Sequence, residues 1–338
     1  MNTEYDRRTP TETVLVTGGT GFVAQALIRR LVEENRYLVR ASVRSRPQAM
    51  PGAVEVIQVG SIDADTDWRE ALHDASVVVH AAAAAEVPND ALSGTQALHA
   101  VNVDGTLNLA RQAAAAGVRR MLFISSIKVH GEHTTPGRAF RPEDPPHPEG
   151  AYAESKWQAE QGLVDICRQT GMEWVIIRPP LVYGPGVKGN FAAMISWIER
   201  GWPLPVLGLR HNLRSLVSVD NLIDLLALCI DHPAAKNGVF LVSDGEDLST
   251  ADLTVRLAKA MNRSPRFFAI PTWTLEALLR LLKKPQIRHR LLGCLQADIS
   301  KTREKLHWIP PVSVDSGLRR AVQPIGGKAV DSRPQSGI

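Results

Sequence analysis

The first two thirds of the chain alternates short apolar runs with longer segments of helical periodicity. The apolar runs are continuous and rich in β-branched residues, which is typical of strands that are buried on both faces. Strand–helix alternation of this kind predicts an α/β fold built on a doubly wound parallel sheet, in which ligands bind at the carboxyl ends of the strands. The predicted strands are residues 14–17, 39–43, 54–59, 77–81, 121–125 and 174–177.

Helical patterns separate these runs at residues 25–34, 68–73, 98–116 and 152–170. After Arg178 the chain becomes rich in Gly and Pro, a strand-like run at 239–242 rejoins the sheet, and helical patterns follow at 250–260 and 273–282. We therefore expect a smaller, discontinuous C-terminal α/β substrate domain. The expected boundaries are a flexible N-terminus at 1–11, a dinucleotide-binding domain at 12–178 plus about 215–245, a substrate domain at about 179–214 and 246–322, and a flexible tail at 323–338.

The composition fits a packed globular protein. Hydrophobic residues make up 44% of the 338 residues and charged residues 22%. The three cysteines, Cys167, Cys229 and Cys294, are widely spaced and odd in number, which argues against a disulfide framework or a zinc site. We expect no metal and a location in the reducing cytoplasm.

The formal net charge is +4. Basic residues cluster at Arg40, Arg44 and Arg46 and again at residues 283–290, which indicates solvated surface or a site for a small anionic ligand. A nucleic-acid partner would need a longer basic face, so we expect none. No signal peptide is visible, and no apolar run reaches the roughly 20 residues that span a bilayer. The Leu-rich stretch at 273–282 carries two charges and predicts an amphipathic helix, which packs internally or touches a membrane surface.

A glycine-rich turn follows the first predicted strand and opens a helix. Its residues are Gly18, Gly19, Thr20, Gly21, Phe22 and Val23. Glycines let the backbone approach a pyrophosphate closely, and the free N–H groups of the helix N-terminus favour an anion. Ala24 stands where the usual fingerprint has a third glycine. The strand before and the helix after the turn predict a Rossmann dinucleotide site rather than a glycine turn without a ligand.

The end of the second predicted strand bears on the choice of nucleotide. Sites for NAD commonly place an acid there to hold the ribose hydroxyls. This chain has Arg44 and Ser45 instead, and arginine makes strong charge-assisted bonds to phosphate. The sequence therefore favours NADP(H). The alternative is NAD(H), and in that case Arg44 would contact only the adenine face or solvent.

Tyr152 and Lys156 lie four residues apart, on one face of a predicted helix. Free tyrosine has a pKa of about 10, and a nearby ammonium should lower it. Ser125 and Ser126 follow the fifth predicted strand and supply a hydroxyl for the substrate oxygen. In ketone reduction Tyr152 would donate a proton while the cofactor supplies a hydride, and in the reverse direction it would accept one. The pair alone is a weak signal, but its place after the glycine turn and the serine pair is specific.

Motifs of this kind in this order resemble the extended short-chain dehydrogenase/reductases, the NAD(P)-dependent sugar-nucleotide epimerase/dehydratase family. The resemblance covers roughly residues 12 to 322. The matching stretches are 17–24, 79–82, 101–106, 123–126, 152–156, 178–185, 214–221, 297–301 and 306–310.

The resemblance implies a role for each matching position. The catalytic positions are Tyr152, Lys156, Ser126 and Asn102, the last supporting the active-site network. Besides the glycine turn, the nucleotide positions are Arg44, Ser45, Ile62, Ala81, Ala82, Ala83, Asn102, Ser125, Tyr152, Lys156 and Pro179. The substrate positions are Ser126, Lys128, Asn190, Arg214 and Asp298. Arg214 would clamp the diphosphate or is a surface arginine, and Asp298 would touch the nucleotide ribose or cap the following helix.

Three departures from the family pattern lie at expected binding positions, two at the sugar pocket and one near the adenine. His130 replaces the usual Tyr and either faces the substrate or substitutes structurally. Leu181 stands where many relatives have Asn, which would alter the sugar pocket or the coupling between the domains. Gly60-Ser61 replaces a common Gly-Asp near the adenine. No Glu follows Ser126 as it does in the dehydratase subgroup, so dehydration is not expected.

The narrower resemblance is to bacterial enzymes that make nucleotide-linked amino sugars for O antigen and other surface polysaccharides. The basic end of the second strand favours NADPH-dependent reduction of a UDP-4-keto-6-deoxy-N-acetylhexosamine. The alternative is a UDP-hexose or UDP-N-acetylhexosamine 4-epimerase that retains NAD and returns the same hydride. A non-catalytic NADP-binding sensor is a third reading, which the presence of both Tyr152 and Lys156 disfavours. The resemblance also implies a homodimer, with helices 98–116 and 152–170 of each subunit forming a four-helix bundle.

Overall fold

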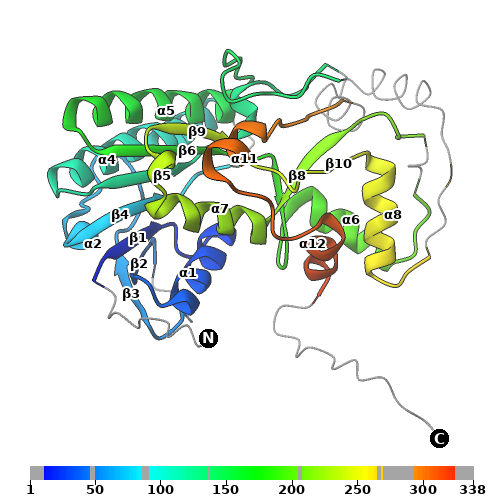
Figure 1. Cartoon of the computed structure of the whole chain (residues 1–338), viewed down its shortest axis with the longest axis horizontal. Helices are drawn as coiled ribbons and strands as arrows, with labels where there is room; N and C mark the ends of the chain where they lie inside the picture. The colour runs from blue at the N-terminus through cyan, green and yellow to red at the C-terminus, as the bar shows by residue number, and fades with distance from the viewer. Residues whose placement is uncertain are drawn as a thin grey trace, which may run out of the picture.

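The computed structural model describes residues 11–45, 50–85, 91–135, 137–204, 208–264, 268 and 293–323. Within these residues a seven-stranded parallel sheet runs in the order β3-β2-β1-β4-β5-β6-β9 (Figure 1). The order reverses between β1 and β4, and ligands of such sheets bind beside that switch point. The predicted doubly wound α/β sheet is confirmed. Its strands are β1 (Thr13–Thr17), β2 (Leu38–Val43), β3 (Val54–Gln58), β4 (Ala75–His80), β5 (Arg120–Ile124), β6 (Glu173–Arg178) and β9 (Gly238–Leu241).

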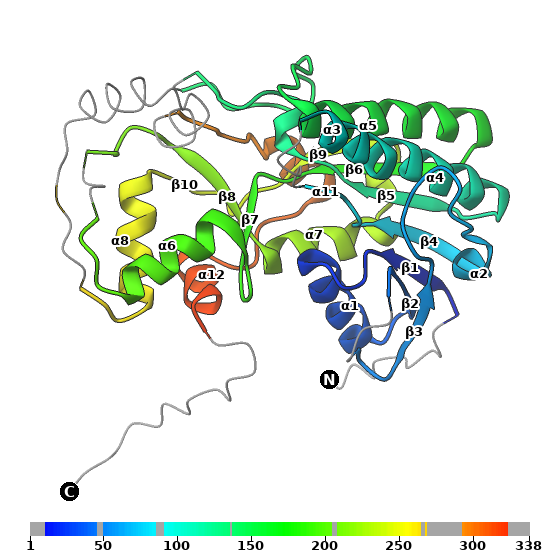
Figure 2. The same ribbon diagram turned by 180° about the vertical axis from the view of Figure 1, so that it is seen from behind.

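Helices cover both faces of this sheet, which explains why its strands read as continuous apolar runs. Successive side chains of a strand point to opposite faces: in β1, Val14 and Val16 pack into one core and Leu15 into the other. Helices α1 (Phe22–Glu34) and α7 (Val219–Asp231) lie on the first face (Figures 1 and 2). The helices on the second face are α2 (Arg69–Leu72), α4 (Gly105–Ala115) and α5 (Ala151–Thr170).

The helix predicted at 98–116 is interrupted in the structure. α3 (Ala91–His99) is followed by a π-helical turn, η1 (Ala100–Asp104), and only then by α4. Where α4 begins, a Cβ on Gly105 would lie 2.5 Å from Cγ2 of Ile62, so the helix start packs tightly on the loop after β3. Single π-turns inside α-helices occur frequently at functional sites, and this one contains Asn102.

A second, smaller sheet carries its own core. It runs in the order β10 (Asp247–Leu248), β8 (Arg214–Ser218) and β7 (Leu181–Tyr183), and α6 (Gly189–Glu199), α8 (Thr250–Ala260) and α12 (Val314–Ala321) pack around it. The chain from 215 to 245, expected in the nucleotide-binding domain, is divided. β8 pairs with β7 and β10, whereas α7 packs on the large sheet and β9 pairs with β6 in it. A buried apolar run indicates a strand without indicating which sheet it joins. The remaining helices are η2 (Ile127–Val129), η3 (Pro233–Ala235) and α11 (Ser300–Leu306).

A buried polar cluster joins the small sheet to the large domain. The hydroxyl of Tyr183 on β7 donates to Oδ2 of Asp244 at 2.6 Å. The other oxygen of Asp244 accepts from the backbone N–H of Ser218 at 2.8 Å and from Nδ2 of Asn221 at 2.6 Å. Burial raises the pKa of Asp244. The stretch 214–221, one of those that match the family, therefore serves in part to hold the two sheets together.

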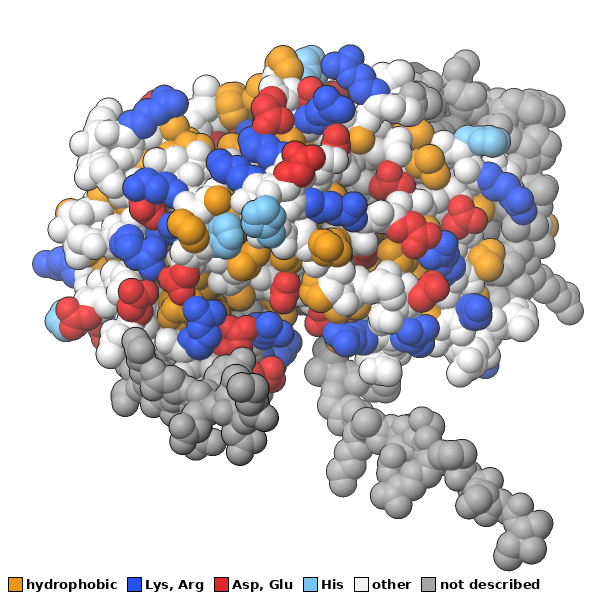
Figure 3. Space-filling model, viewed as in Figure 1, with side chains coloured by type: hydrophobic (Ala, Val, Ile, Leu, Met, Phe, Trp, Pro, Cys, Tyr) orange, Lys and Arg blue, Asp and Glu red, His pale blue; other side chains and the backbone are white. Residues whose placement is uncertain are grey.

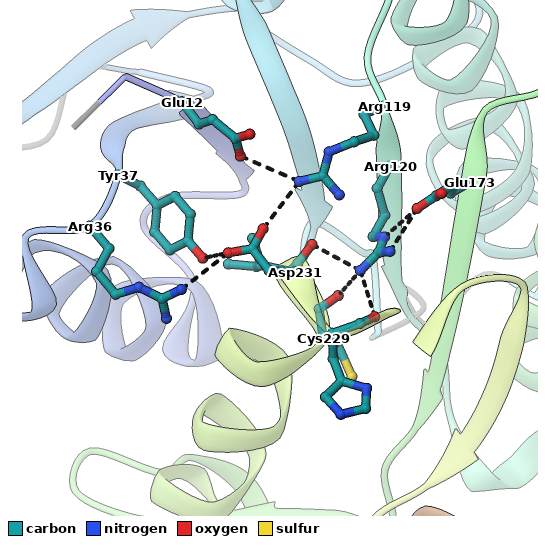
Figure 4. A network of polar contacts seen from close by, with 10 residues as sticks. Glu12, Arg36, Tyr37, Arg119, Arg120, Glu173, Cys229 and Asp231 are labelled. Atoms are coloured by element: carbon teal, nitrogen blue, oxygen red, sulfur yellow. Dashed lines mark hydrogen bonds and ion pairs between the residues drawn. The ribbon is translucent and has the colours of Figure 1, made fainter. Parts of the chain in front are cut away.

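A second polar network lies at the opposite edge of the large sheet, where the strands begin (Figure 4). Arg120, at the start of β5, is buried and donates to the carbonyls of Cys229 at 2.8 Å and of Ile230 at 3.0 Å. These carbonyls belong to the C-terminal turn of α7, which favours a cation. Glu173 on β6 accepts from the same guanidinium at 2.8 Å. Arg120 thus fastens α7 to the sheet, far from the strand ends where a ligand would bind.

The charged side chains on the surface are mixed in sign. Figure 3 shows positive and negative side chains interspersed over the face that it presents. No helix among the described residues is long and apolar enough to cross a membrane. The helix expected at 273–282, the basic cluster at 283–290 and residues 324–338 of the expected tail lie outside the described residues, as do residues 1–10.

Candidate active site

The glycine turn lies between β1 and α1, beside the switch point of the sheet. Gly18 has φ +68°, and a Cβ there would lie 2.9 Å from Cα of Ala82, which follows β4. Only glycine allows both this conformation and this approach. Helix α1 begins after Gly21 with no side-chain cap and no acid in its first turn. Its free N–H groups are therefore available to an anion such as a pyrophosphate.

Two buried hydroxyls at the carboxyl end of the sheet point to a ligand. Oγ of Ser42 near the end of β2 and Oγ of Ser125 after β5 have no hydrogen-bond partner among the described residues. Buried polar groups are almost always paired, so a bound nucleotide would satisfy what the chain leaves open. Arg44 and Ser45 are exposed just beyond Ser42, and Arg44 makes no ion pair or hydrogen bond within the described ranges. These observations fit a nicotinamide nucleotide.

Several expected nucleotide positions, and the expected catalytic Ser126, lie at the carboxyl ends of neighbouring strands. Ala81–Ala83 follow β4, Ser125 and Ser126 follow β5, and Pro179 follows β6, while β1, β4, β5 and β6 are adjacent in the sheet. The loop after β5 is fixed by two backbone bonds, from Ser125 to the carbonyl of Ile177 at 2.8 Å and from Ile127 to that of Pro179 at 3.0 Å. The sheet therefore places the glycine turn, the serine pair and the start of α5 along one edge.

Tyr152 and Lys156 lie on the first two turns of α5. Lys156 is only 1% exposed, and its Nζ lies 4.2 Å from the centre of the Phe123 ring. Burial lowers the pKa of Lys156 to about 7, against an opposing effect of Glu160. Burial also raises the pKa of Tyr152. The expectation that the ammonium lowers the tyrosine pKa is wrong for this arrangement, because desolvation of the phenol is the cause that acts.

The hydroxyl group of Ser126 is oriented by one hydrogen bond and keeps its own hydrogen available for donation. Its Oγ accepts from the backbone N–H of Lys128 at 3.2 Å, which caps η2 and leaves its hydroxyl hydrogen for another acceptor. The side chain of Lys128 itself is paired with Glu132 at 2.6 Å. Lys128 therefore lies two residues from Ser126 with its charge already compensated.

The side chain of Asn102 in the π-turn forms hydrogen bonds with the backbone of Ala84 and with Ser155, and not with the side chains of Tyr152 or Lys156. Its amide oxygen accepts from the N–H of Ala84 and its Nδ2 donates to the carbonyl of Ala84, both at 2.9 Å. Nδ2 also donates to Oγ of Ser155 at 3.0 Å, and that hydroxyl donates to the carbonyl of Tyr152 at 2.8 Å. The asparagine thus ties the loop after β4 to the first turn of α5.

The expected substrate residues come from the small domain and its borders. Asn190 is exposed in the first turn of α6, and Arg214 on β8 donates to the carbonyl of Gly293 at 3.2 Å. Asp298 accepts from the backbone N–H of Ser300 at 2.9 Å and from Arg141 at 3.1 Å. The contact with Ser300 agrees with the helix-capping alternative for Asp298. No contact joins Asn190 to Arg214 or Asp298 within the described residues.

The two departures at the sugar pocket behave differently. His130 is 3% exposed, accepts from Nη1 of Arg178 at 2.8 Å and stacks on Phe140. Burial, and then the charge of Arg178, lower its pKa to about 4. These contacts favour the structural alternative for His130. Leu181, in contrast, is 50% exposed at the start of β7, beyond the strand end that carries Pro179.

Four polar residues behind the site were given no role from the sequence, although they lie in the stretches that match the family: Thr17, His80, Thr106 and Ser155. His80, at the end of β4, contacts Oγ1 of Thr17 at 2.7 Å through Nδ1 and Oγ1 of Thr106 at 2.9 Å through Nε2. A histidine inside an otherwise apolar buried strand was the available signal, because buried polar groups need partners. The partners themselves come from two other elements, β1 and α4, which the sequence does not place side by side.

Comparison with known proteins identifies the family of the chain. The model of the NAD dependent epimerase/dehydratase family matches residues 14–243. A UDP-glucose 4-epimerase of Vibrio cholerae is 44% identical over 319 residues, covering 94% of this chain and 96% of that protein.

Solved structures show the same fold. A UDP-glucose 4-epimerase of Thermotoga maritima with UDP-glucose superposes with a TM-score of 0.73 at 23% identity, covering 91% of this chain and 97% of that one. A UDP-glucuronic acid 4-epimerase of Bacillus cereus in complex with NAD gives 0.73 at 21% identity, covering 91% and 96%. With its Rossmann sheet, glycine turn and Tyr152/Lys156 helix, the chain belongs to the NAD-dependent epimerase/dehydratase family of extended short-chain dehydrogenase/reductase-like enzymes.

Proposed function

We propose that the protein is a UDP-hexose 4-epimerase that retains NAD. The observation that carries this proposal is the 44% identity to a UDP-glucose 4-epimerase along 94% of the chain. The geometry supports it, since the acid/base pair, the serine hydroxyls and the glycine turn lie along one sheet edge. Of the two reactions that the sequence left open, epimerisation thus takes precedence over reduction of a 4-keto sugar.

The residues divide the chemistry between them. Tyr152 removes the proton of the sugar O4 when C4 is oxidised and returns it when C4 is reduced on the opposite face. The free hydroxyl hydrogen of Ser126 would donate to the same oxygen, and Lys156 would hold the nicotinamide ribose. NAD, when bound, supplies the hydride acceptor and donor at C4. Gly18–Val23 would hold its pyrophosphate, and Ala81–Ala83, Ser125 and Pro179 would surround its nicotinamide ribose.

The substrate would lie between the two sheets. Arg214 would clamp the diphosphate, because a fixed guanidinium pairs well with a doubly anionic group. Asn190, Lys128 and Asp298 are proposed to contact the rest of the nucleotide sugar. We also propose a homodimer formed through α4 and α5, which light scattering on the purified protein would test.

A second candidate reaction rests on one observation, the guanidinium of Arg44, for which the described part of the chain offers no partner. It follows β2 without an acid nearby and makes no contact within the described residues, which suits a 2′-phosphate. A 4-keto sugar reductase that consumes NADPH would use such a group, whereas an enzyme that retains NAD would gain nothing from it. Arg44 and Ser45 in this candidate hold the phosphate.

One experiment separates the two reactions. The nucleotide released from purified, denatured protein is identified, and the protein is then incubated with UDP-glucose, UDP-N-acetylglucosamine or a UDP-4-keto-6-deoxy-N-acetylhexosamine. If the protein is an epimerase, denaturation should release NAD, and the native protein should convert UDP-glucose or UDP-N-acetylglucosamine without added cofactor. Stoichiometric NADPH oxidation with the keto sugar, and no epimerisation, would overturn the proposal in favour of the reductase. Tyr152→Phe is the control: it should lose turnover by at least about a hundredfold and still contain nucleotide.

A further inference from the structure

Behind the site, a series of hydrogen bonds connects the end of β1, the end of β4 and the start of α4. The N–H of Ala82 donates to Oγ1 of Thr17 at 3.3 Å, and Thr17 Oγ1 lies 2.7 Å from Nδ1 of His80. On the other side of the ring, Nε2 lies 2.9 Å from Oγ1 of Thr106. The hydroxyl of Thr106 donates to the backbone carbonyl of Asn102 at 2.7 Å. The side chains of Thr17, His80 and Thr106 are all buried.

These contacts define the tautomer of His80. The single hydroxyl hydrogen of Thr106 points at the Asn102 carbonyl, so its oxygen must accept from Nε2–H of His80. Nδ1 is then the unprotonated nitrogen and accepts the hydroxyl hydrogen of Thr17, whose oxygen accepts from Ala82. Every donor in the series meets an acceptor. An imidazolium would present a second N–H to Thr17 and leave the hydroxyl hydrogen of Thr17 without an acceptor.

The surroundings also require a neutral ring. His80 stacks on Phe123 at 5.8 Å, and the ammonium of Lys156 lies on the same phenyl ring. Lys156 is the charged group that acts on His80, and together with the larger effect of burial it lowers the pKa of His80 to about 3. A positive charge on residue 80 would therefore lie close to the catalytic ammonium in an interior that already disfavours one cation.

The series ends at both points that hold the loop after β4. Thr17 holds the loop at Ala82. Asn102, whose carbonyl is fixed by Thr106, holds it at Ala84 through both its amide atoms and continues through Ser155 to the backbone of Tyr152. His80 is the one side chain that contacts the Thr17 branch and the Thr106 branch together within the described residues.

We propose that His80 is a positioning residue: its neutral ring, protonated on Nε2, sets the loop at Ala81–Ala85 and the catalytic helix in one relative geometry, so that the nicotinamide ribose pocket is formed before the nucleotide binds. The inference rests on the proposed function only in requiring a nicotinamide nucleotide at the glycine turn. It holds for epimerase and reductase alike.

The test uses buried threonines that differ in whether they contact His80. Thr106→Val removes the acceptor of Nε2–H at nearly constant volume, and Thr106→Ser keeps it. Thr254→Val is the matched control, because Thr254 is equally buried and donates to the carbonyl four residues earlier, as Thr106 does, but on α8. We expect Thr106→Val to raise the dissociation constant of NAD about tenfold, as for one lost buried hydrogen bond. Thr106→Ser should restore binding, and Thr254→Val should leave it within about twofold.

A second measurement needs no variant and no turnover. In nucleotide-free wild-type protein with ¹⁵N-labelled histidine, the His80 resonances, assigned with a His80→Gln variant, should show a proton on Nε2 alone. This state should not change between about pH 6 and 8, where an ordinary histidine titrates. A proton on Nδ1, or titration in that range, would overturn the proposal. Loss of stability in Thr106→Val with unchanged NAD affinity would also overturn it, because the network would then be structural only.

Discussion

Replacing Lys156 by Met should make the nucleotide-free protein more stable while abolishing its activity. The lysine is 1% exposed, and its ammonium rests on the ring of Phe123. The acid that favours its charge, Glu160, has both oxygens engaged by Arg178 at 3.0 and 2.5 Å. The folded protein therefore holds a cation with incomplete compensation. Methionine has similar length and fills such a space without a charge.

The size of the effect follows from the pKa. Burial lowers the pKa of Lys156 from 10.5 to about 7, and at about 1.4 kcal/mol per pH unit this corresponds to about 5 kcal/mol of destabilisation at low pH and about 4 kcal/mol at pH 7. A desolvated cation–π contact offsets about 2 kcal/mol of this. The predicted net gain for Lys156→Met at pH 7 is therefore about 2 to 3 kcal/mol.

The pH dependence gives the test its direction. Between pH 7 and 10.5 the unfolded chain binds a proton on this lysine that the folded chain does not, so the penalty is fully present below about pH 7 and is lost as the pH rises toward 10.5. Urea unfolding of both proteins from pH 7 to 10 should show the difference shrinking steadily. The proteins must be free of nucleotide, since bound ligand adds its own stabilisation.

Lys259→Met, at an exposed position on α8, is the control and should change stability by less than about 0.5 kcal/mol at every pH. A destabilised Lys156→Met protein, or a gain that does not depend on pH, would refute the reasoning. The first result would mean that the cation–π contact outweighs desolvation. The second would mean that the gain comes from packing.

Three further changes test the framework. Glu160→Gln should cost about 3 to 5 kcal/mol in urea unfolding because it strands the buried charge of Arg178; a cost below 1 kcal/mol would contradict the pairing. Arg120→Met should cost about 3 kcal/mol, since it removes the bonds to the end of α7 and leaves Glu173 without that partner, and Arg36→Met, at an exposed member of the same network in Figure 4, should cost less than 1 kcal/mol. The pKa of His130 is about 4 in the folded protein, so between pH 6.5 and 4 this side chain is protonated in the unfolded chain and not in the folded one. The stability of the protein therefore falls as the pH falls through this range. His130→Gln should therefore remove about 2 kcal/mol of the stability lost between pH 7 and 5, and an unchanged pH profile would contradict this.

Much of the large domain could be predicted from the sequence because its signals are local. Strands buried on both faces read as continuous apolar runs, and residues 14–17, 39–43 and 121–125 correspond closely to β1, β2 and β5. The glycine turn could be located because a tight turn between a strand and a helix requires specific residues at specific positions. The Tyr152/Lys156 spacing follows from the helical repeat alone.

The rest depended on contacts between distant segments. The π-turn at Ala100–Asp104 leaves no apolar periodicity of its own, so residues 98–116 read as one helix. The run at Arg214–Ser218 is a strand by its composition, but its partners β7 and β10 lie 30 residues or so away in the sequence. The tyrosine pKa failed as a prediction because the sequence gives the spacing of charges and not the desolvation around them.

The position of the catalytic lysine depends on how firmly α5 is held. A helix that could rotate would expose the ammonium to water and remove the desolvation penalty. Three contacts oppose this: Asn102 binds Ser155 beside the lysine, Glu160 binds Arg178 one turn later, and a Cβ on Gly162 would lie 2.5 Å from Leu107 on α4. Ser155 and Gly162 are seven residues apart and so lie on nearly the same face of the helix, whereas Glu160 lies on another. The framework of α5 thus offsets the destabilisation that its active-site lysine imposes, and loosening any of the three contacts should raise the pKa of Lys156 toward its ordinary value.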